Sequence, residues 1–168
     1  MKKNLVITFC LILLLALPDI TLASPPAETS FVITGTTVNP GEVTYPGSVA
    51  QIKGLEAQGD VEGALVGTFH YIENATVNLT TGWGTNQGFM TITTTSPCTG
   101  TIDIRFEGRT QINPAEGVAI IADQPFTILK GAGGCEGIHG QGTRSAVVSL
   151  FDPTFTVTYT AQVHWDPQ

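Results

Sequence analysis

The chain has 168 residues, a formal net charge of −7 and 42% hydrophobic residues, and only 12% of its residues are charged. This length suits one domain with a sizeable core. Because an acidic chain repels phosphate backbones and anionic lipid surfaces, the composition argues against nucleic acid and membranes as partners of the mature protein.

The first 23 residues have the three-part order of a secretory signal peptide. Lys2 and Lys3 precede an apolar run from Leu5 to Leu17, and the segment Thr21-Leu22-Ala23 has small residues at both recognition positions of a cleavage site. The run is shorter than the roughly 20 residues that span a bilayer. We therefore predict removal of residues 1–23 and export of a chain that begins at Ser24 to the periplasm or the extracellular space.

After this leader, residues 24–30 are expected to form a flexible tail, and residues 31–168 a β domain. The residue pattern alternates with a period of two and shows no convincing helical periodicity. In chain order the predicted strands are Phe31–Val38, Ser48–Lys53, Leu65–Ile72, Thr76–Thr81, Phe89–Thr95, Ile102–Arg109, Gly117–Ala122, Pro125–Leu129, Arg144–Phe151 and Thr154–Trp165. Turn signals rich in Pro, Gly and Asn separate most of them.

Trp83 lies between two glycines in a predicted turn. An exposed indole there could stack on a sugar or another flat ligand. The alternative, which we favour, is that the ring covers one end of the domain.

Two cysteines remain after the leader, Cys98 and Cys135. In an oxidising compartment an isolated pair usually forms one disulfide, which stabilises the fold by roughly 3–4 kcal/mol. The alternative is a reactive thiol, but neither cysteine has a neighbouring histidine or a helix start that would activate it.

Two strands show the clearest alternation. In Ile102–Arg109 the apolar side chains alternate with charged ones, and we expect the charged face on the outside, where such ion pairs contribute little stability. If it lined a cavity instead, Arg105 and Arg109 could bind a carboxylate. In the last strand every second residue from Phe155 to Trp165 is apolar, which predicts one buried face.

The three histidines, His70, His139 and His164, show no paired spacing of the kind that strand or helix metal sites use. The chain also lacks a nucleophile elbow and a phosphate-binding glycine motif. We therefore expect no metal, no cofactor and no inherited catalytic residue.

The segment Phe126–Thr143 predicts a strand, a glycine-rich corner and a second strand. It resembles the corresponding turn of the allene oxide cyclase-like and dirigent-like β-barrels. The glycines that fall on the pattern are Gly131, Gly133, Gly137, Gly140 and Gly142. Lys130, Ala132 and Cys135 stand where the pattern has Gly, Thr and an aromatic residue. The resemblance implies a calycin-type barrel in which Cys135 points inward, a position that fits a bond to Cys98.

Many short strands at regular spacing, together with this resemblance, predict an all-β fold: a single antiparallel barrel of about eight strands. The leading hypothesis is a secreted, soluble, non-enzymatic domain whose candidate ligand is a small apolar molecule inside the barrel. The alternatives are a cyclase or isomerase acting on a hydrophobic substrate there, and a structural extracellular protein. The predicted cavity-lining residues are Tyr71, Phe106, Tyr159 and Trp165, with the tyrosine hydroxyls as polar groups.

Overall fold

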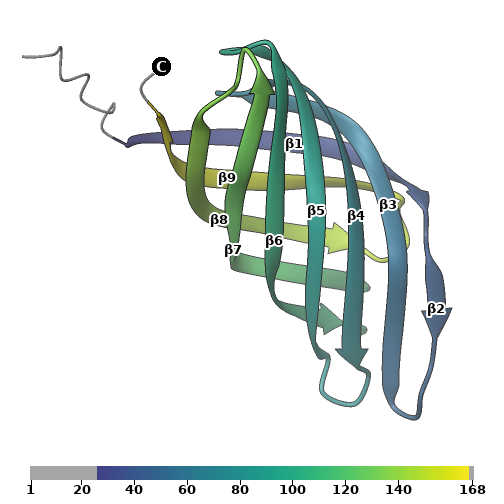
Figure 1. The fold of residues 1–168 in the computed structure, drawn as a ribbon. Coiled ribbons are helices and arrows are strands. Elements are labelled where there is room, and N and C mark those ends of the chain that lie inside the picture. Colours follow the sequence, from purple (N-terminus) through teal and green to yellow (C-terminus); the bar gives the residue numbers. More distant parts are fainter. Residues whose placement is uncertain (1–25, 167–168) are drawn as a thin grey trace, which may run out of the picture.

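The computed structural model of the protein describes residues 26–166. The predicted signal peptide lies outside these residues and stays a prediction. The described part consists of antiparallel β-strands joined by short turns (Figure 1). The strands are β1 (Ala27–Asn39), β2 (Glu42–Thr44), β3 (Val49–Gly63), β4 (Val66–Asn78), β5 (Trp83–Ser96), β6 (Gly100–Asn113), β7 (Val118–Gly133), β8 (Ile138–Ser149) and β9 (Thr154–Trp165). Within residues 26–166, no helix is long and apolar enough to cross a membrane.

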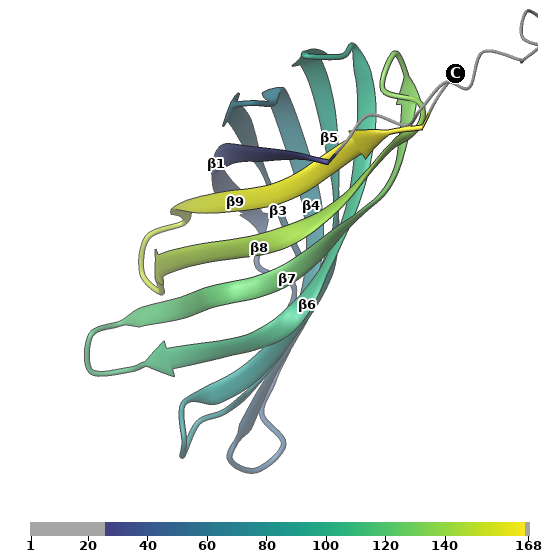
Figure 2. The same ribbon diagram turned by 90° about the vertical axis from the view of Figure 1, so that its left-hand side faces the viewer.

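Eight of these strands form a closed barrel. The strands from β3 to β9 pair in sequence, β9 pairs with β1, and β1 pairs with β3 to complete the ring. β2 lies outside this ring and pairs only with the first part of β3. The prediction of a single antiparallel β-barrel is therefore confirmed. Figures 1 and 2 show β1 and β9 crossing the opposite wall, formed by β3 to β6, at a steep angle.

The start of the barrel differs from the sequence prediction. Residues 27–30 were expected in a flexible tail, but they form the first part of β1 and pair with residues 160–163 of β9. These four residues are extended because their pairing with β9 continues as far as Val163. Residues 24 and 25 lie outside the described part.

Three observed strands, β3, β4 and β7, correspond to predicted segments that were too short or were divided in two. β3 continues to Gly63 through a Gly- and acid-containing segment with weak strand propensity, because β1 and β4 pair with it on both sides. β4 is continuous across the gap predicted between Ile72 and Thr76. β7 joins two predicted strands, and Asp123 forms an irregularity between them with a φ of 47°.

The two ends of the barrel differ. We call the end with the β3–β4, β5–β6 and β7–β8 turns the disulfide end, because Cys98 and Cys135 in two of these turns are bonded there, with their Cα atoms 5.2 Å apart. We call the opposite end, with the β4–β5, β6–β7 and β8–β9 turns, the cavity end. The strands fan apart toward the cavity end in Figure 2. The predicted disulfide is thus present, and Cys135 is buried.

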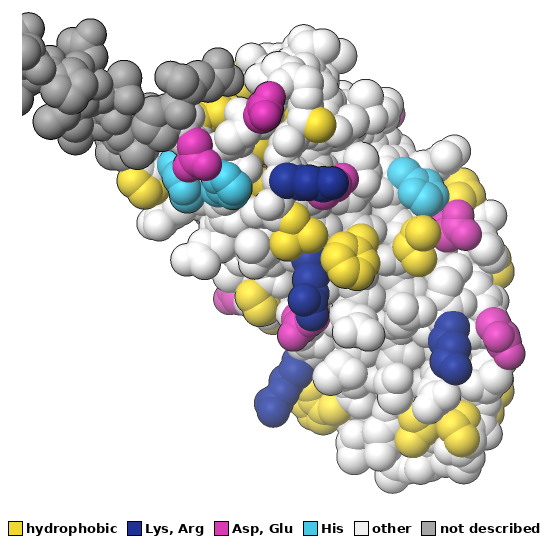
Figure 3. Space-filling view, viewed as in Figure 1, with side chains coloured by type: hydrophobic (Ala, Val, Ile, Leu, Met, Phe, Trp, Pro, Cys, Tyr) yellow, Lys and Arg dark blue, Asp and Glu magenta, His cyan; other side chains and the backbone are white. Residues whose placement is uncertain are grey.

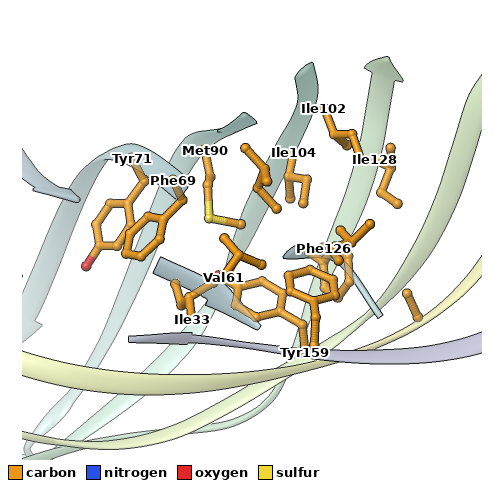
Figure 4. Close-up of a cluster of buried hydrophobic side chains, with 14 of the residues drawn as sticks. Ile33, Val61, Phe69, Tyr71, Met90, Ile102, Ile104, Phe126, Ile128 and Tyr159 are labelled. Carbon is orange, nitrogen blue, oxygen red and sulfur yellow. The ribbon is translucent and has the colours of Figure 1, made fainter. Parts of the chain in front are cut away.

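A cluster of large apolar side chains fills the barrel from its middle to the disulfide end (Figure 4). Phe31 stacks on Tyr159 with ring centroids 4.8 Å apart, and Phe126 packs edge-on against both rings. Isoleucines from β5, β6 and β7 complete the cluster. The predicted inward faces of Ile102–Phe106 and of the last strand are therefore confirmed.

The outer surface carries the charged residues of β6. Arg105, Glu107 and Arg109 are exposed and Asp103 is partly so, which places this row outside the barrel as expected. Figure 3 shows basic side chains, most of them beside acidic ones, following one another down this face. This arrangement leaves Arg105 and Arg109 unavailable to a ligand inside the barrel.

Candidate functional site

A cavity of about 500 Å³ occupies the cavity end of the barrel. Its walls come from the ends of β3 to β8 and the start of β9, and the β8–β9 loop lies at its mouth. Most of its wall is apolar, and it includes the aliphatic residues Ile52, Leu55, Ala75, Val77, Ile112 and Ile121. A groove of about 780 Å³ runs over the outside of β3 to β6, but polar residues, including the exposed Lys53 and Gln87, make up most of its lining residues. The inner cavity is therefore the candidate site.

A buried arginine lies at the inner end of this cavity. Arg144 occupies an inward position of β8, and only 1% of its side chain is exposed. One terminal nitrogen, Nη2, lies 3.6 Å from the Glu73 carboxylate on β4, across the barrel. The guanidinium carbon lies 3.5 Å from the centre of the Phe106 ring, so the planar cation stacks on an aromatic face.

Hydrogen bonds extend this ion pair into a ring of four side chains. Arg144 Nε donates to Gln124 Oε1 over 2.7 Å, and Gln124 Nε2 donates to Asn86 Oδ1. Asn86 Nδ2 in turn donates to Glu73 Oε1 over 3.0 Å. The four residues come from β8, β7, β5 and β4, so their network crosses the barrel between the apolar core and the cavity. Such polar networks are stable inside a protein when their members are hydrogen-bonded to one another.

Two buried polar atoms at this network have no hydrogen-bond partner among the described residues: Arg144 Nη2 and the Tyr159 hydroxyl. The two residues are direct cross-strand neighbours on β8 and β9. A buried polar group without a partner costs free energy, and more so when it is charged. The protein's own side chains therefore leave the buried guanidinium of Arg144, which lines the cavity, incompletely hydrogen-bonded.

The two tyrosines near the network stay protonated. Burial raises the pKa of Tyr71 well above its ordinary range, and the nearby Glu73 carboxylate raises it further. Burial also raises the pKa of Tyr159, although the charge of Arg144 opposes this shift. At neutral pH both side chains therefore carry a hydroxyl that can donate a hydrogen bond, and neither can act as a base.

Two glycines make room for the network. A Cβ atom on Gly88 would lie 2.5 Å from the Phe106 ring, and one on Gly108 would lie 2.7 Å from Cγ of Gln124. Larger residues at positions 88 and 108 would therefore collide with two side chains that contact Arg144. One is the Phe106 ring, on which the guanidinium stacks, and the other is Gln124, which accepts a hydrogen bond from Arg144.

The structure brings two of the predicted lining residues to the cavity region. Tyr71 lines the cavity, and its hydroxyl points away from the apolar cluster in Figure 4. Phe106 lies beneath Arg144. Tyr159 is fully buried in the core, and Trp165 is partly buried at the disulfide end, beside Ile138. Their roles in ligand binding remain predictions.

The sequence analysis missed all four members of the polar network. A signal for Glu73 was present, because it shares the inward parity of Phe69, Tyr71 and Val77 on β4. The predicted break between Ile72 and Thr76 hid this parity. Arg144 has the same parity as the apolar Ala146 and Val148 on β8, so a charge on an apolar strand face was again the signal.

The histidines and Trp83 lie on the outer surface. His139 and His164 are cross-strand neighbours with ring centroids 5.8 Å apart, a pairing that their separation in the sequence does not reveal. His139 Nε2 lies 3.0 Å from the Asp166 carboxylate. Within residues 26–166 no group of three or more metal-ligating side chains is arranged to hold a metal ion. Trp83 is 52% exposed.

Comparison with known proteins gives a likeness of fold. No protein-family model matches the chain, and no curated protein matches it. A solved protein of unknown function from the DUF3224 family, from Shewanella oneidensis MR-1, has a TM-score of 0.56 and 12% identity, over 88% of this chain and 100% of that one. The pterocarpan synthase dirigent protein GePTS1 has a TM-score of 0.40 and 14% identity, over 90% of this chain and 97% of that one. At 12% identity the likeness to the DUF3224 protein concerns the fold alone, the closed antiparallel barrel described above.

Proposed function

We propose that this chain binds one small, largely apolar molecule in the cavity of its barrel. The observation that carries the proposal is Arg144, a buried cation at the inner end of an apolar cavity, with one terminal nitrogen that is ion-paired with Glu73 but has no hydrogen-bond partner. A protein that needed only a stable core would place an apolar residue at this position, because a buried ion pair is seldom more stable than packed hydrophobic side chains.

The size and lining of the cavity support the same proposal. Its volume of about 500 Å³ lies within the range of roughly 300–1,000 Å³ for small-molecule sites. Such sites combine an apolar wall with a few convergent polar groups, which here are Glu73, Arg144 and the Tyr71 hydroxyl. This combination favours binding over a purely structural role.

The proposal is tested with N-phenyl-1-naphthylamine, an uncharged dye that fluoresces strongly in apolar surroundings. We expect saturable binding of about one dye per chain. Ala75→Trp, on the cavity wall, fills part of the cavity and should weaken binding at least about tenfold. Thr76→Trp, the next residue on β4 and exposed on the outside, is the matched control and should leave binding unchanged. Equal binding to both variants would place the dye elsewhere and refute the proposal.

A second candidate function, catalysis of an isomerisation or cyclisation, is favoured by the carboxylate of Glu73 beside the cavity. A carboxylate next to a bound molecule can accept a proton from it, and the Arg144 guanidinium can stabilise the negative charge that then develops on an oxygen. The test is exchange of the methyl protons of 2-acetylnaphthalene with deuterium oxide, followed by NMR. Exchange that is faster than in buffer and is lost in Glu73→Gln would support this function, and exchange at the buffer rate would count against it.

We further infer that the protein acts outside the cytoplasm. The Cys98–Cys135 disulfide is compatible with this location, and the sequence of residues 1–23 predicts export. Intact-mass measurement of the exported protein should place its first residue at Ser24 or a near neighbour. Recovery of a chain that keeps residues 5–17 would refute the inference.

A further inference from the structure

We infer that the molecule bound in the cavity is uncharged and presents a hydrogen-bond acceptor, such as a ketone or ester carbonyl oxygen, to the guanidinium of Arg144. This inference rests on the proposed function and names the ligand chemistry of the same site. It follows from the charges that face the cavity and from the direction of the hydrogen bonds at its inner end.

The charges at the cavity disfavour an ionic ligand. Among the residues that line it, Arg144 carries a positive charge, and Glu73 and Asp152 carry negative charges. Arg144 and Glu73 balance each other at the inner end, where their nearest charged atoms are 3.6 Å apart. Asp152 lies at the exposed mouth, and its hydrogen bonds from Thr154 lower its pKa, so it stays negative at neutral pH. A carboxylate that reached Arg144 would meet Glu73 at close range, and a bound amine would meet Arg144 itself.

The hydrogen bonds at the inner end of the cavity leave one donor, Arg144 Nη2, without an acceptor. The side chains donate in one direction, from Arg144 through Gln124 and Asn86 to Glu73. The carboxylate of Glu73 is therefore already an acceptor within the network, whereas Arg144 Nη2 has no acceptor within hydrogen-bond distance among the described residues. An arginine has no acceptor of its own, so the group that completes this site must be an acceptor. The Tyr159 hydroxyl, the other atom without a hydrogen-bond partner, belongs to the cross-strand neighbour of Arg144, but Tyr159 is buried in the core and does not line the cavity.

The cost of an unpartnered charged donor makes this preference specific. A site built to donate a hydrogen bond discriminates strongly against a ligand that lacks the acceptor, because the donor then stays unpaired and buried. The apolar wall contributes affinity for any apolar molecule of suitable size. Arg144 discriminates among such molecules by the polar group that each one carries.

The inference is tested with three ligands that share a naphthalene ring: 2-acetylnaphthalene, 2-ethylnaphthalene and 2-naphthoate. The first has a neutral acceptor, the second has an alkyl group of similar shape, and the third has a carboxylate. Their affinities are measured by displacement of N-phenyl-1-naphthylamine. Replacing Arg144 should weaken 2-acetylnaphthalene at least about tenfold and leave 2-ethylnaphthalene nearly unchanged, because only the ketone loses a hydrogen bond to a charged donor.

The variants are chosen so that loss of folding does not decide the result. Arg144→Met alone leaves Glu73 buried without its cation, so the comparison uses the double variant Arg144→Met with Glu73→Gln, which keeps the site neutral. Glu73→Gln alone makes the complementary change, because it leaves Arg144 without its counter-charge. It should strengthen binding of 2-naphthoate at least about tenfold and change that of the ketone little. Glu56→Gln removes a carboxylate that pairs with His70 on the outer surface, and it is the control for the same change in net charge.

The outcomes separate this inference from the function on which it rests. If none of the naphthalenes competes with the dye, and Ala75→Trp has no effect on dye binding, the proposed function itself fails. If 2-ethylnaphthalene and 2-acetylnaphthalene bind and lose affinity equally in the double variant, binding in the cavity stands and the role of Arg144 is refuted. Wild-type protein that prefers 2-naphthoate, and loses it with Arg144, would instead identify a carboxylate ligand and overturn the inference.

Discussion

The two halves of the barrel use the same strands for different purposes. At the disulfide end, inward residues such as Phe31, Ile104 and Phe126 fill the interior. At the cavity end, the inward residues of the same walls include Ala75 and Val148, and the strands fan apart (Figure 2). The polar network of Glu73, Asn86, Gln124 and Arg144 lies at the boundary. The comparison teaches that one closed sheet can be filled at one end and hold a cavity at the other, where its strands fan apart and register shifts interrupt the β6–β7 and β7–β8 pairings.

The strongest test of this boundary is to remove its cation. Arg144→Met should lower the free energy of unfolding by about 3–5 kcal/mol, because it leaves the mostly buried Glu73 carboxylate without its partner. Adding Glu73→Gln should restore much of the loss, since the remaining network is neutral. Urea unfolding of the wild type, the two single variants and the double variant measures this coupling. Additive losses in the double variant would show that the two side chains do not stabilise each other.

The disulfide tests whether the two halves depend on each other. Cys98→Ala with Cys135→Ala should lower the free energy of unfolding by about 2–5 kcal/mol, because the bond links positions 37 residues apart in the unfolded chain. Binding of N-phenyl-1-naphthylamine should change little, since the bond and the cavity lie at opposite ends. Parallel losses of stability and dye affinity in the folded variant would show that the two ends act as one unit.

Two isoleucine-to-alanine substitutions compare the packing of the core with the packing of the cavity wall. Ile104→Ala should cost about 2–5 kcal/mol, because Ile104 is fully buried in the close-packed core. Ile112→Ala removes the same atoms from the cavity wall, where they are only partly buried, and should cost about 1 kcal/mol. Urea unfolding gives both values. Equal costs would mean that the wall of the cavity is packed as tightly as the core.

The filled half of the barrel was the more predictable half. Alternation along Ile102–Phe106 and along the last strand identified its inward face, because burial of one strand face depends on neighbouring residues in the sequence. The disulfide followed from the number of cysteines and from the glycine-corner resemblance. The boundary network was not predicted, because it joins Glu73 to Arg144 across the barrel. Pairing of this kind depends on the closure of the ring and on strand register, which short-range patterns do not determine.

The smallest expected effect concerns the tyrosine hydroxyls on either side of the boundary, and it emerges only at high pH. Burial raises the pKa of Tyr71 and of Tyr159, so the folded protein keeps both protons where the unfolded chain, with an ordinary tyrosine pKa of about 10, releases them. The stabilisation from these groups is thus complete below about pH 10 and is lost as the pH rises further, at up to about 1.4 kcal/mol per pH unit for each tyrosine.

Urea unfolding between about pH 9 and 11.5 should show this fall in the free energy of unfolding of the wild type, and a shallower fall in Tyr71→Phe with Tyr159→Phe. Tyr45→Phe, at an exposed position, is the control and should follow the wild type. If the double variant also follows the wild type, deprotonation of these two side chains does not limit stability, and the boundary is open enough to water for their hydroxyls to ionise.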